Sequence, residues 1–350
     1  MTIEELFKYT VEKGASDLHI TPGYKPTIRL YDVLMPIASE PVLQNADTKL
    51  LLGALLNSAQ KEEFETNKEI DFGYDWKDMR FRVNYYVMRG GHAAAFRAVP
   101  RKIRTIEELG LPNTMHKFAK MKEGLVLLTG PTGEGKSTTI AAIIDEINHN
   151  SPRHIITIED PIEFVYTPNQ SIISQRELHS DTHSWSKALR SVLREDPDVV
   201  LIGEMRDHDT IQAALTIAET GHLVFSTLHT SSTPEAINRI VDVFPGSQQN
   251  QIRSQLASVL RSVIYQRLIP NIQKTGRVPA LEILFNSSAV KSLIREAKAF
   301  MIDSVLETGE EQEMILFEKY LSRLYKQNMI SRESAFGYAT RSKEIEKFIK

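Results

Sequence analysis

The chain has 350 residues, with 42 lysines and arginines, 45 aspartates and glutamates, and a formal net charge of -3 at pH 7. This length is enough for about two domains, and the balanced charge excludes a bulk attraction to nucleic acid or to an anionic membrane. There is no cysteine, no signal-like N-terminus and no long apolar run, so disulfides and thiolate metal sites are excluded and we expect a soluble, intracellular protein.

The first hundred residues are typical of a small α+β domain with an antiparallel sheet. A helix is predicted over 2–13, because apolar residues recur on one face and Gly14 follows as a stop. A second helix is predicted over 47–67. Strands bounded by turn residues are predicted at 17–20, 27–31, 69–76, 79–88 and 93–99.

From residue 125 the pattern changes to strand alternating with helix, which predicts a parallel sheet with crossover helices. The strands are predicted at 125–129, 154–158, 199–202 and 223–227, and the helices at 137–148, 184–194, 210–219 and 233–243. The tail from residue 287 is almost wholly helical in pattern. The predicted class is therefore α/β, with an N-terminal domain over 1–100, a linker over 101–124, a second domain over 125–286 and a helical region over 287–350.

A glycine-rich motif of the form G-x-x-x-x-G-K-S lies between the strand and the helix that open the second domain. Its glycines let backbone N–H groups turn toward phosphate oxygens, its lysine adds positive charge, and its serine hydroxyl can bind Mg2+. The helix that follows aims its N-terminus at the anion. The motif predicts a site for a nucleoside triphosphate with Mg2+, formed by Gly130, Pro131, Thr132, Gly133, Glu134, Gly135, Lys136, Ser137 and Thr138.

Four aliphatic residues at 199–202 lead into Glu204. A buried strand here would bring this carboxylate to the carboxyl edge of the sheet, where open α/β sheets bind ligands. We expect Glu204 to support the Mg2+ ion, usually through water.

A second apolar strand leads into three acids, Glu159, Asp160 and Glu163, which are interrupted by Pro161. Because proline ends a strand, we expect these acids in a loop at the same edge of the sheet. In-line hydrolysis needs a group that orients and deprotonates water, and a carboxylate here suits that role. Spacing alone does not choose among the three acids.

Two histidines flank the last predicted strand of the parallel sheet. His222 stands at its base, after Gly221, and His229 at its tip. We therefore expect His229 near the phosphate edge, whereas a lone histidine such as His222 is more often structural.

Taken in this order, the motifs resemble those of the secretion ATPase superfamily, and within it the retraction ATPases of type IV pili. The resemblance spans nearly the whole chain and also covers residues 15–19, 81–84, 107–112, 193–198 and 203–207. It implies a PAS-like N-terminal domain, a RecA-like ATPase domain, and a homohexamer with ATP between neighbouring subunits. It further implies that Glu163 is the general base, Glu204 an atypical Walker B acid and His229 a sensor close to the phosphates.

The same resemblance implies that arginines of the N-terminal domain reach a neighbouring subunit's nucleotide. There they would neutralise charge that develops on the transferring phosphoryl group. Arg82 and Arg97 fit this pattern, and Arg89 and Arg104 fit it less well.

The implied activity is hydrolysis of ATP with Mg2+ to drive pilus retraction and twitching motility. The implied partners are an inner-membrane pilus platform protein and, indirectly, the pilin subunits, at the cytoplasmic face of the membrane and without nucleic acid. Other functions within the superfamily stay open, namely accessory retraction, pilus assembly and DNA uptake. A nucleotide-regulated binding module that does not hydrolyse ATP is a further alternative. Assembly ATPases usually carry a four-cysteine zinc insertion, which this chain lacks.

Two places depart from the family's pattern. Residues 289–296 resemble its retraction-associated segment, but Lys291 lacks the planar guanidinium of the family's arginine. Glu134 stands in the glycine-rich motif where the family usually has a small residue. We expect the Glu134 side chain to point outward, so that Glu134→Ser changes ATP affinity less than about threefold.

Overall fold

The computed structural model describes residues 2–30, 33–77, 79–99 and 102–349. The chain divides into two compact units, Met1–Lys102 with Pro161–Val165, and Ile103–Asp160 with Tyr166–Lys350. Residues 103–124, for which we expected a linker, group with the second unit. Pro100 and Arg101, at the predicted boundary, lie outside the described residues, as does Tyr31 at the end of a predicted strand.

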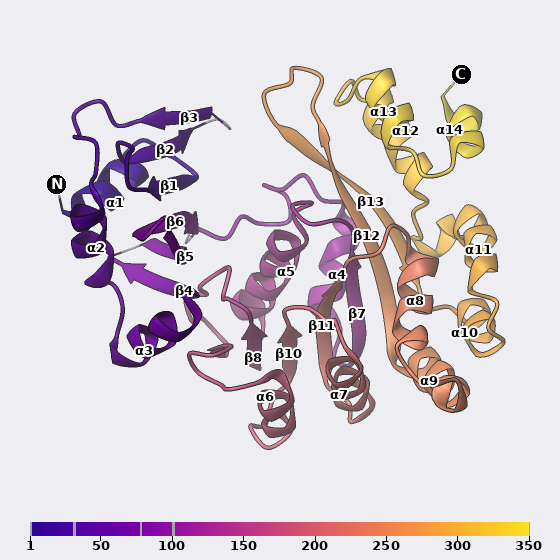
Figure 1. The fold of residues 1–350 in the computed structure, drawn as a ribbon. Helices are drawn as coiled ribbons and strands as arrows, with labels where there is room; N and C mark the ends of the chain where they lie inside the picture. Colours follow the sequence, from indigo (N-terminus) through magenta and orange to yellow (C-terminus); the bar gives the residue numbers. More distant parts are fainter. Residues whose placement is uncertain (1, 31–32, 78, 100–101, 350) are drawn as a thin grey trace. The chain divides into compact units, whose positions relative to one another are not determined.

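The first unit contains a six-stranded antiparallel sheet in the order β3-β2-β1-β6-β5-β4 (Figure 1). Its strands are β1 (Asp17–Ile20), β2 (Thr27–Leu30), β3 (Val33–Pro36), β4 (Glu69–Trp76), β5 (Met79–Met88) and β6 (Gly91–Val99). Its helices are α1 (Ile3–Glu12), α2 (Asn45–Gly53) and α3 (Ser58–Asn67). In α1, Thr2 and Glu5 form a capping box at the N-terminus, and Phe7 stacks on Phe81 of the sheet at 4.4 Å between ring centroids.

The single helix predicted over 47–67 is wrong, because the segment forms two helices, α2 and α3. The break comes at Asn57, whose side chain accepts a hydrogen bond from the backbone N–H of Gln60 at 2.9 Å while the Gln60 side chain accepts from Asn57 N. This reciprocal cap starts a new helix. Strand β3, an exposed edge strand, was also not predicted.

The second unit is built on a seven-stranded sheet in the order β13-β12-β7-β11-β10-β8-β9, in which only β13 pairs antiparallel to its neighbour. Its strands are β7 (Gly124–Thr129), β8 (His154–Glu159), β9 (Ile172–Glu177), β10 (Val199–Ile202), β11 (Leu223–Leu228), β12 (Leu260–Pro270) and β13 (Arg277–Phe285). Its longer helices are α5 (Lys136–Asn150), α6 (Trp185–Val192), α7 (His208–Glu219), α8 (Thr233–Asp242), α9 (Gly246–Val259), α10 (Ser288–Arg295) and α12 (Phe317–Lys326). The shorter helices are α4 (His116–Lys120), α11 (Ile302–Thr308), α13 (Arg332–Tyr338) and α14 (Ser342–Phe348), with 3-10 turns at Asn113–Met115, Ala299–Met301 and Gly309–Gln312.

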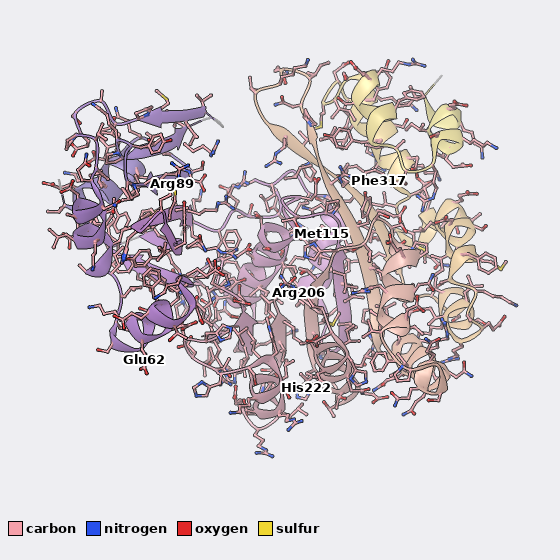
Figure 2. The ribbon with its side chains drawn as sticks, in the orientation of Figure 1. Glu62, Arg89, Met115, Arg206, His222 and Phe317 are labelled. Carbon is pink, nitrogen blue, oxygen red and sulfur yellow. The ribbon has the colours of Figure 1, made fainter. Side chains whose placement is uncertain are left out.

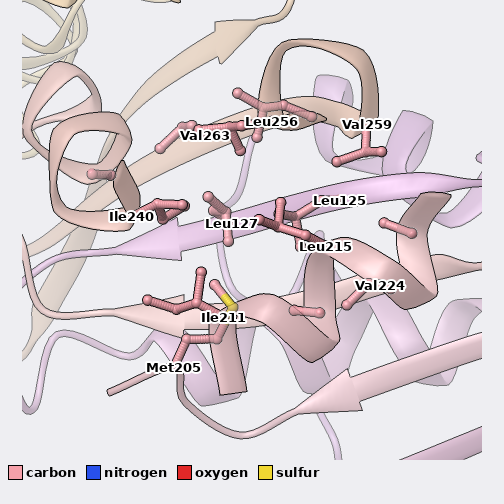
Figure 3. Close-up of a cluster of buried hydrophobic side chains, with 14 of the residues drawn as sticks. Leu125, Leu127, Met205, Ile211, Leu215, Val224, Ile240, Leu256, Val259 and Val263 are labelled. Carbon is pink, nitrogen blue, oxygen red and sulfur yellow. The ribbon is translucent and has the colours of Figure 1, made fainter. Parts of the chain in front are cut away.

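The core of this unit explains why its strands are continuous apolar runs. Every residue of β7, β10 and β11 is buried, as expected for parallel strands that are covered on both faces. Figure 3 shows Leu125 and Leu127 of β7 among side chains of the covering helices, including Leu215 and Leu256. The α/β class with a parallel sheet, predicted from these runs, is confirmed.

Several elements of the sheet were not predicted, namely β9, β12, β13 and the long helix α9. Strand β12 interrupts its aliphatic residues with Gln266 and Arg267, and this weakens the periodic signal that marks a strand. Its placement matters, because β12 pairs in parallel with β7, the strand that leads into the glycine-rich motif.

The C-terminal helices are joined to the sheet by an ion cluster that is centred on Arg341 and contains two buried carboxylates. Its Nη1 lies 2.8 Å from Glu282 of β13 and 3.0 Å from Glu318 of α12, and its Nη2 lies 2.5 Å from Asp303 of α11. The Glu282 and Glu318 side chains are 1% and 0% exposed. Two desolvated carboxylates therefore depend on one guanidinium. Among the described residues, no helix is both long and apolar enough to span a bilayer.

Candidate functional site

The glycine-rich motif forms the turn between β7 and α5. Gly130 has φ 142° and Gly135 has φ 76°, conformations that residues with a Cβ rarely adopt. A Cβ atom at Gly130 would also lie 2.4 Å from the backbone oxygen of Gln266. The backbone at Gly130 is therefore compatible only with glycine, and the turn leads into the N-terminus of α5, where an anion is favoured.

Lys136 is the first residue of α5 and is only 6% exposed. Its Nζ donates hydrogen bonds to the carbonyl oxygens of Gly130 at 2.7 Å and Pro131 at 2.8 Å. The ammonium group therefore lies inside the turn of the motif. Ser137 and Thr138, half-buried, follow in the first turn of the helix.

Glu134 does not point outward as we expected, and that expectation is wrong. Its side chain is 14% exposed, and its Oε1 lies 3.0 Å from Nε of Arg267 on β12. Its Oε2 accepts a hydrogen bond from the backbone N–H of Leu268. The carboxylate is turned onto the neighbouring strand because that strand offers it a cation and a backbone donor.

Two side chains that follow neighbouring strands meet at the carboxyl edge of the sheet. Glu204 follows β10 and His229 follows β11, and His229 Nε2 lies 3.3 Å from Glu204 Oε2. On its other side, His229 Nδ1 lies 3.5 Å from the Thr132 hydroxyl in the glycine-rich motif. The structure thus brings Glu204, His229 and the motif together.

The loop that carries His229 is fixed to the end of β7. The Thr129 hydroxyl donates to the carbonyl oxygen of Thr230 at 3.0 Å and accepts from the Thr230 N–H at 3.1 Å. Arg206, to which the sequence assigned no role, pairs with Glu204, with Nη2 2.5 Å from Oε1. This hydrogen bond to Glu204 raises the pKa of Arg206. Glu204 is therefore held between a guanidinium and an imidazole.

His222 lies at the opposite edge of the sheet from this cluster. Its Nδ1 is within 3.1 Å of the carbonyl oxygen of Ile217 and 3.0 Å of the Thr220 hydroxyl, at the end of α7. Figure 2 labels His222 and Arg206, which lie toward opposite ends of the parallel strands. The structure does not bring His222 to the candidate site.

The three acids after β8 occupy different environments. Glu159 is not in a loop, as we had expected, but is the last residue of β8, because the strand pairs with β9 up to this position. It is buried and accepts a hydrogen bond from the Thr157 hydroxyl at 2.7 Å. Asp160 follows and is exposed. Glu163 belongs to the segment Pro161–Val165, which groups with the first unit.

Comparison with known proteins settles the family. The profile of the type II/IV secretion system protein family matches residues 1–344. The chain belongs to this family.

Relatives within the secretion family cover nearly the whole chain. The type IV pilus retraction ATPase PilT of Pseudomonas aeruginosa is 45% identical over 96% of this chain and 97% of its own. The type IV pilus ATPase PilU of the same organism is 36% identical over 100% of this chain and 92% of its own. A crystal structure of the pilus retraction motor PilT with bound ADP matches with a TM-score of 0.93 at 42% identity, covering 99% of both chains. The resemblance to secretion ATPases of the retraction type is confirmed.

Of the arginines that the secretion family's pattern selected, Arg82 and Arg97 lie on the sheet of the first unit. Arg82 of β5 and Arg97 of β6 are register partners on neighbouring strands. Arg97 is 70% exposed, and its Nε lies 2.9 Å from Asp17 Oδ1. Arg89 lies in the turn after β5, and Arg104 is exposed in the second unit.

The residues at the carboxyl edge fit a Mg2+ ion carried by a nucleotide. In the part of the chain that the structure describes, no three acidic or histidine side chains form a metal-binding group. Such a group is not required, because nucleotide-bound Mg2+ takes only one or two protein ligands and completes its octahedron with phosphates and waters. Ser137 would supply a hydroxyl oxygen, and Glu204, whose two oxygens are engaged by Arg206 and His229, would support the ion through water.

Proposed function

We propose that this chain is an ATPase motor that drives retraction of type IV pili, and hence twitching motility. The observation that carries the proposal is the joint presence of the glycine-rich motif and the Glu204–His229 pair in a chain 45% identical to a pilus retraction ATPase. The likeness to a PilT structure that holds ADP supports a nucleotide site.

The turn from Gly130 to Gly135 and the N-terminus of α5 would bind the phosphates of ATP through backbone N–H groups and Lys136. Ser137 and Glu204 would hold Mg2+, which neutralises charge on the phosphate oxygens when it is bound. His229 contacts both Glu204 and Thr132, so it is positioned to respond to a change at either.

Glu163 is our candidate for the general base, carried over from the family's motif. A carboxylate in this role orients the attacking water and accepts its proton. Arg82 and Arg97 would arrive from a neighbouring subunit and stabilise charge on the transferring phosphoryl group. In this mechanism, closure aligns Glu163, the water and these arginines, and product release reopens the interface.

A site completed by a neighbour requires an assembly, and we propose a homohexameric ring. Rotation of the two units during each cycle would pass force to an inner-membrane pilus platform protein, and pilin subunits would be withdrawn as a consequence. The ring would work at the cytoplasmic face of the membrane.

Phosphate release from ATP by the purified chain tests the enzymatic part of this proposal, with Lys136→Ala as the control. Turnover that Mg2+ stimulates and Lys136→Ala removes is the expected result. Turnover no higher than that of Lys136→Ala would instead favour a nucleotide-regulated binding module.

Pilus retraction in a strain that lacks its own retraction ATPase tests the biological part. The native chain should restore retraction and Lys136→Ala should not. Restoration of DNA uptake without retraction, or of pilus assembly in a strain that lacks its assembly ATPase, would favour another function within the family.

A further inference from the structure

The carboxylate of Glu134 stands in a motif whose purpose is to bind an anion. A negative charge here would repel phosphate oxygens, and the repulsion grows as the surroundings lose water. The side chain is mostly buried, so solvent screens it poorly. We therefore looked for contacts that keep the Glu134 carboxylate away from bound phosphates.

Strand β12 lies where it can make these contacts. In its parallel pairing with β7, Tyr265 lies opposite Thr129, the last residue of β7. The residues after Tyr265 therefore continue past the end of β7 and run alongside the glycine-rich motif.

Three consecutive residues of β12 contact the motif or the helix that follows it. The Gln266 side chain donates to the carbonyl oxygen of Glu134 at 2.7 Å and accepts from the Thr139 hydroxyl at 2.8 Å. Arg267 donates to Glu134 Oε1 at 3.0 Å, and the Leu268 N–H donates to Glu134 Oε2. Both the backbone and the carboxylate of Glu134 are thus held by the same strand.

Arg267 is itself held from the other side. Its guanidinium lies 5.2 Å from the centroid of the Tyr338 ring on α13, in cation–π contact. Its Nη1 also lies 3.5 Å from the Tyr265 hydroxyl. The guanidinium is therefore oriented toward Glu134 by groups from β12 and the C-terminal helices.

We propose that Arg267 is a positioning residue for triphosphate binding, which keeps the Glu134 carboxylate on β12 and out of the phosphate site. The inference rests on the proposed function, because it concerns the affinity of the same nucleotide site. Without Arg267, Glu134 loses its cation and its negative charge acts on the bound phosphates. The effect is larger for ATP than for ADP, because ATP carries one more phosphate group.

The test is a double-mutant cycle read by titration with ATP and with ADP. Arg267→Gln should weaken ATP binding by about tenfold, the scale expected when a charged partner is left unpaired. Glu134→Gln should change ATP affinity by less than about threefold, because it removes the repelling charge along with the ion pair. The variant that combines both changes should return to within about threefold of the native chain.

This rescue separates a positioning role from a merely structural one, since a strand damaged by the loss of Arg267 is not repaired by changing Glu134. Arg261→Gln is the matched control, because Arg261 pairs with Glu123 near the other end of β12. It should leave ATP affinity unchanged. Arg267→Lys, which keeps the charge but not the guanidinium geometry, should give an intermediate loss.

Native-like ATP affinity of Arg267→Gln, or a double variant as weak as Arg267→Gln, would overturn the inference alone. If Arg267→Gln does not fold, full ATP affinity of Arg267→Met, which has no charge, overturns it as well. If the native chain binds ATP no better than Lys136→Ala, the proposed function fails and this inference fails with it.

Discussion

His229 Nε2 lies 3.3 Å from Glu204 Oε2, so the side chains that follow two neighbouring strands meet beside the glycine-rich motif. His229→Ala should lower turnover about tenfold, the scale of one lost hydrogen bond to a charged group, with little change in ATP affinity. Steady-state phosphate release measures the turnover, and an equilibrium titration measures the ATP affinity. His222→Ala, at the other end of β11, is the matched control and should turn over normally; equal losses in the two variants would remove the proposed role of His229.

Glu163→Gln should bind ATP normally and hydrolyse it at least about a hundredfold more slowly, because the amide cannot accept the proton of the attacking water. Single-turnover hydrolysis and an equilibrium titration make the two measurements. Asp160→Asn is the comparison, since that acid is close in sequence and exposed. Near-normal turnover of Glu163→Gln, or a strong loss only in Asp160→Asn, would refute the assignment of the base.

Mixed rings test whether a neighbouring subunit contributes Arg82. Lys136→Ala and Arg82→Gln should each be inactive alone, whereas mixing them should recover turnover, because some interfaces then combine an intact motif with an intact arginine. Lys136→Ala mixed with Glu163→Gln should recover none, since both residues act within one subunit. Absence of recovery in the first mixture would place Arg82 outside the neighbour's site.

Gly130→Ala should abolish high-affinity ATP binding. The new Cβ would lie 2.4 Å from the Gln266 backbone oxygen at a φ of 142°, so the turn has to change shape. Strain of this kind also costs on the order of 1–3 kcal/mol in the free energy of unfolding. Urea unfolding and ATP titration make the measurements. Gly246→Ala, in open space at the start of α9, is the control. Equal ATP affinity and equal stability of the two variants would contradict the prediction.

Asp207 is predicted to make the stability of the second unit sensitive to acid. Its carboxylate caps α7, and the hydrogen bond from the Thr210 N–H, at 2.9 Å, lowers the pKa of Asp207. A lowered folded-state pKa gives stability that is present above the unfolded value of about 4 and lost as pH falls through the folded value.

Asp207→Ala should therefore lower the free energy of unfolding by about 1 kcal/mol at pH 7, and by less at pH 3. Asp207→Asn, which keeps an acceptor without a titrating proton, should lose less and vary less with pH. Urea unfolding at the two pH values measures these losses in the free energy of unfolding. A loss in Asp207→Ala that is larger at pH 3 than at pH 7 would contradict the prediction.

The parallel sheet was predictable because a strand that is buried on both faces is an unbroken run of apolar residues in the sequence. The glycine-rich turn was predictable from its motif. The sequence predicted only that Glu204 and His229 lie at the same edge of the sheet. Their contact was not predictable, because sequence order does not reveal that β10 and β11 are neighbours. The break at Asn57 was visible as an Asn-x-x-Gln cap and was missed.

The pairing of Glu134 with Arg267 was beyond prediction from sequence. The two residues are separated by 133 positions, and β12, which carries Arg267, has no clean periodicity. From the motif alone, the Glu134 side chain could only be expected to point either outward or toward the phosphates. A third possibility, a neighbouring strand that holds the carboxylate, exists only once the parallel pairing of β7 and β12 is known.

The ion cluster at Arg341 bears on how the chain can be altered for experiments. Glu282 and Glu318, both fully desolvated, depend on a guanidinium near the C-terminal end. Trimming the last helix to obtain better crystals, starting before Arg341, would strip the cation from two buried carboxylates at a cost of about 3–5 kcal/mol. Purification tags and fluorophores are better attached beyond α14 than exchanged for it.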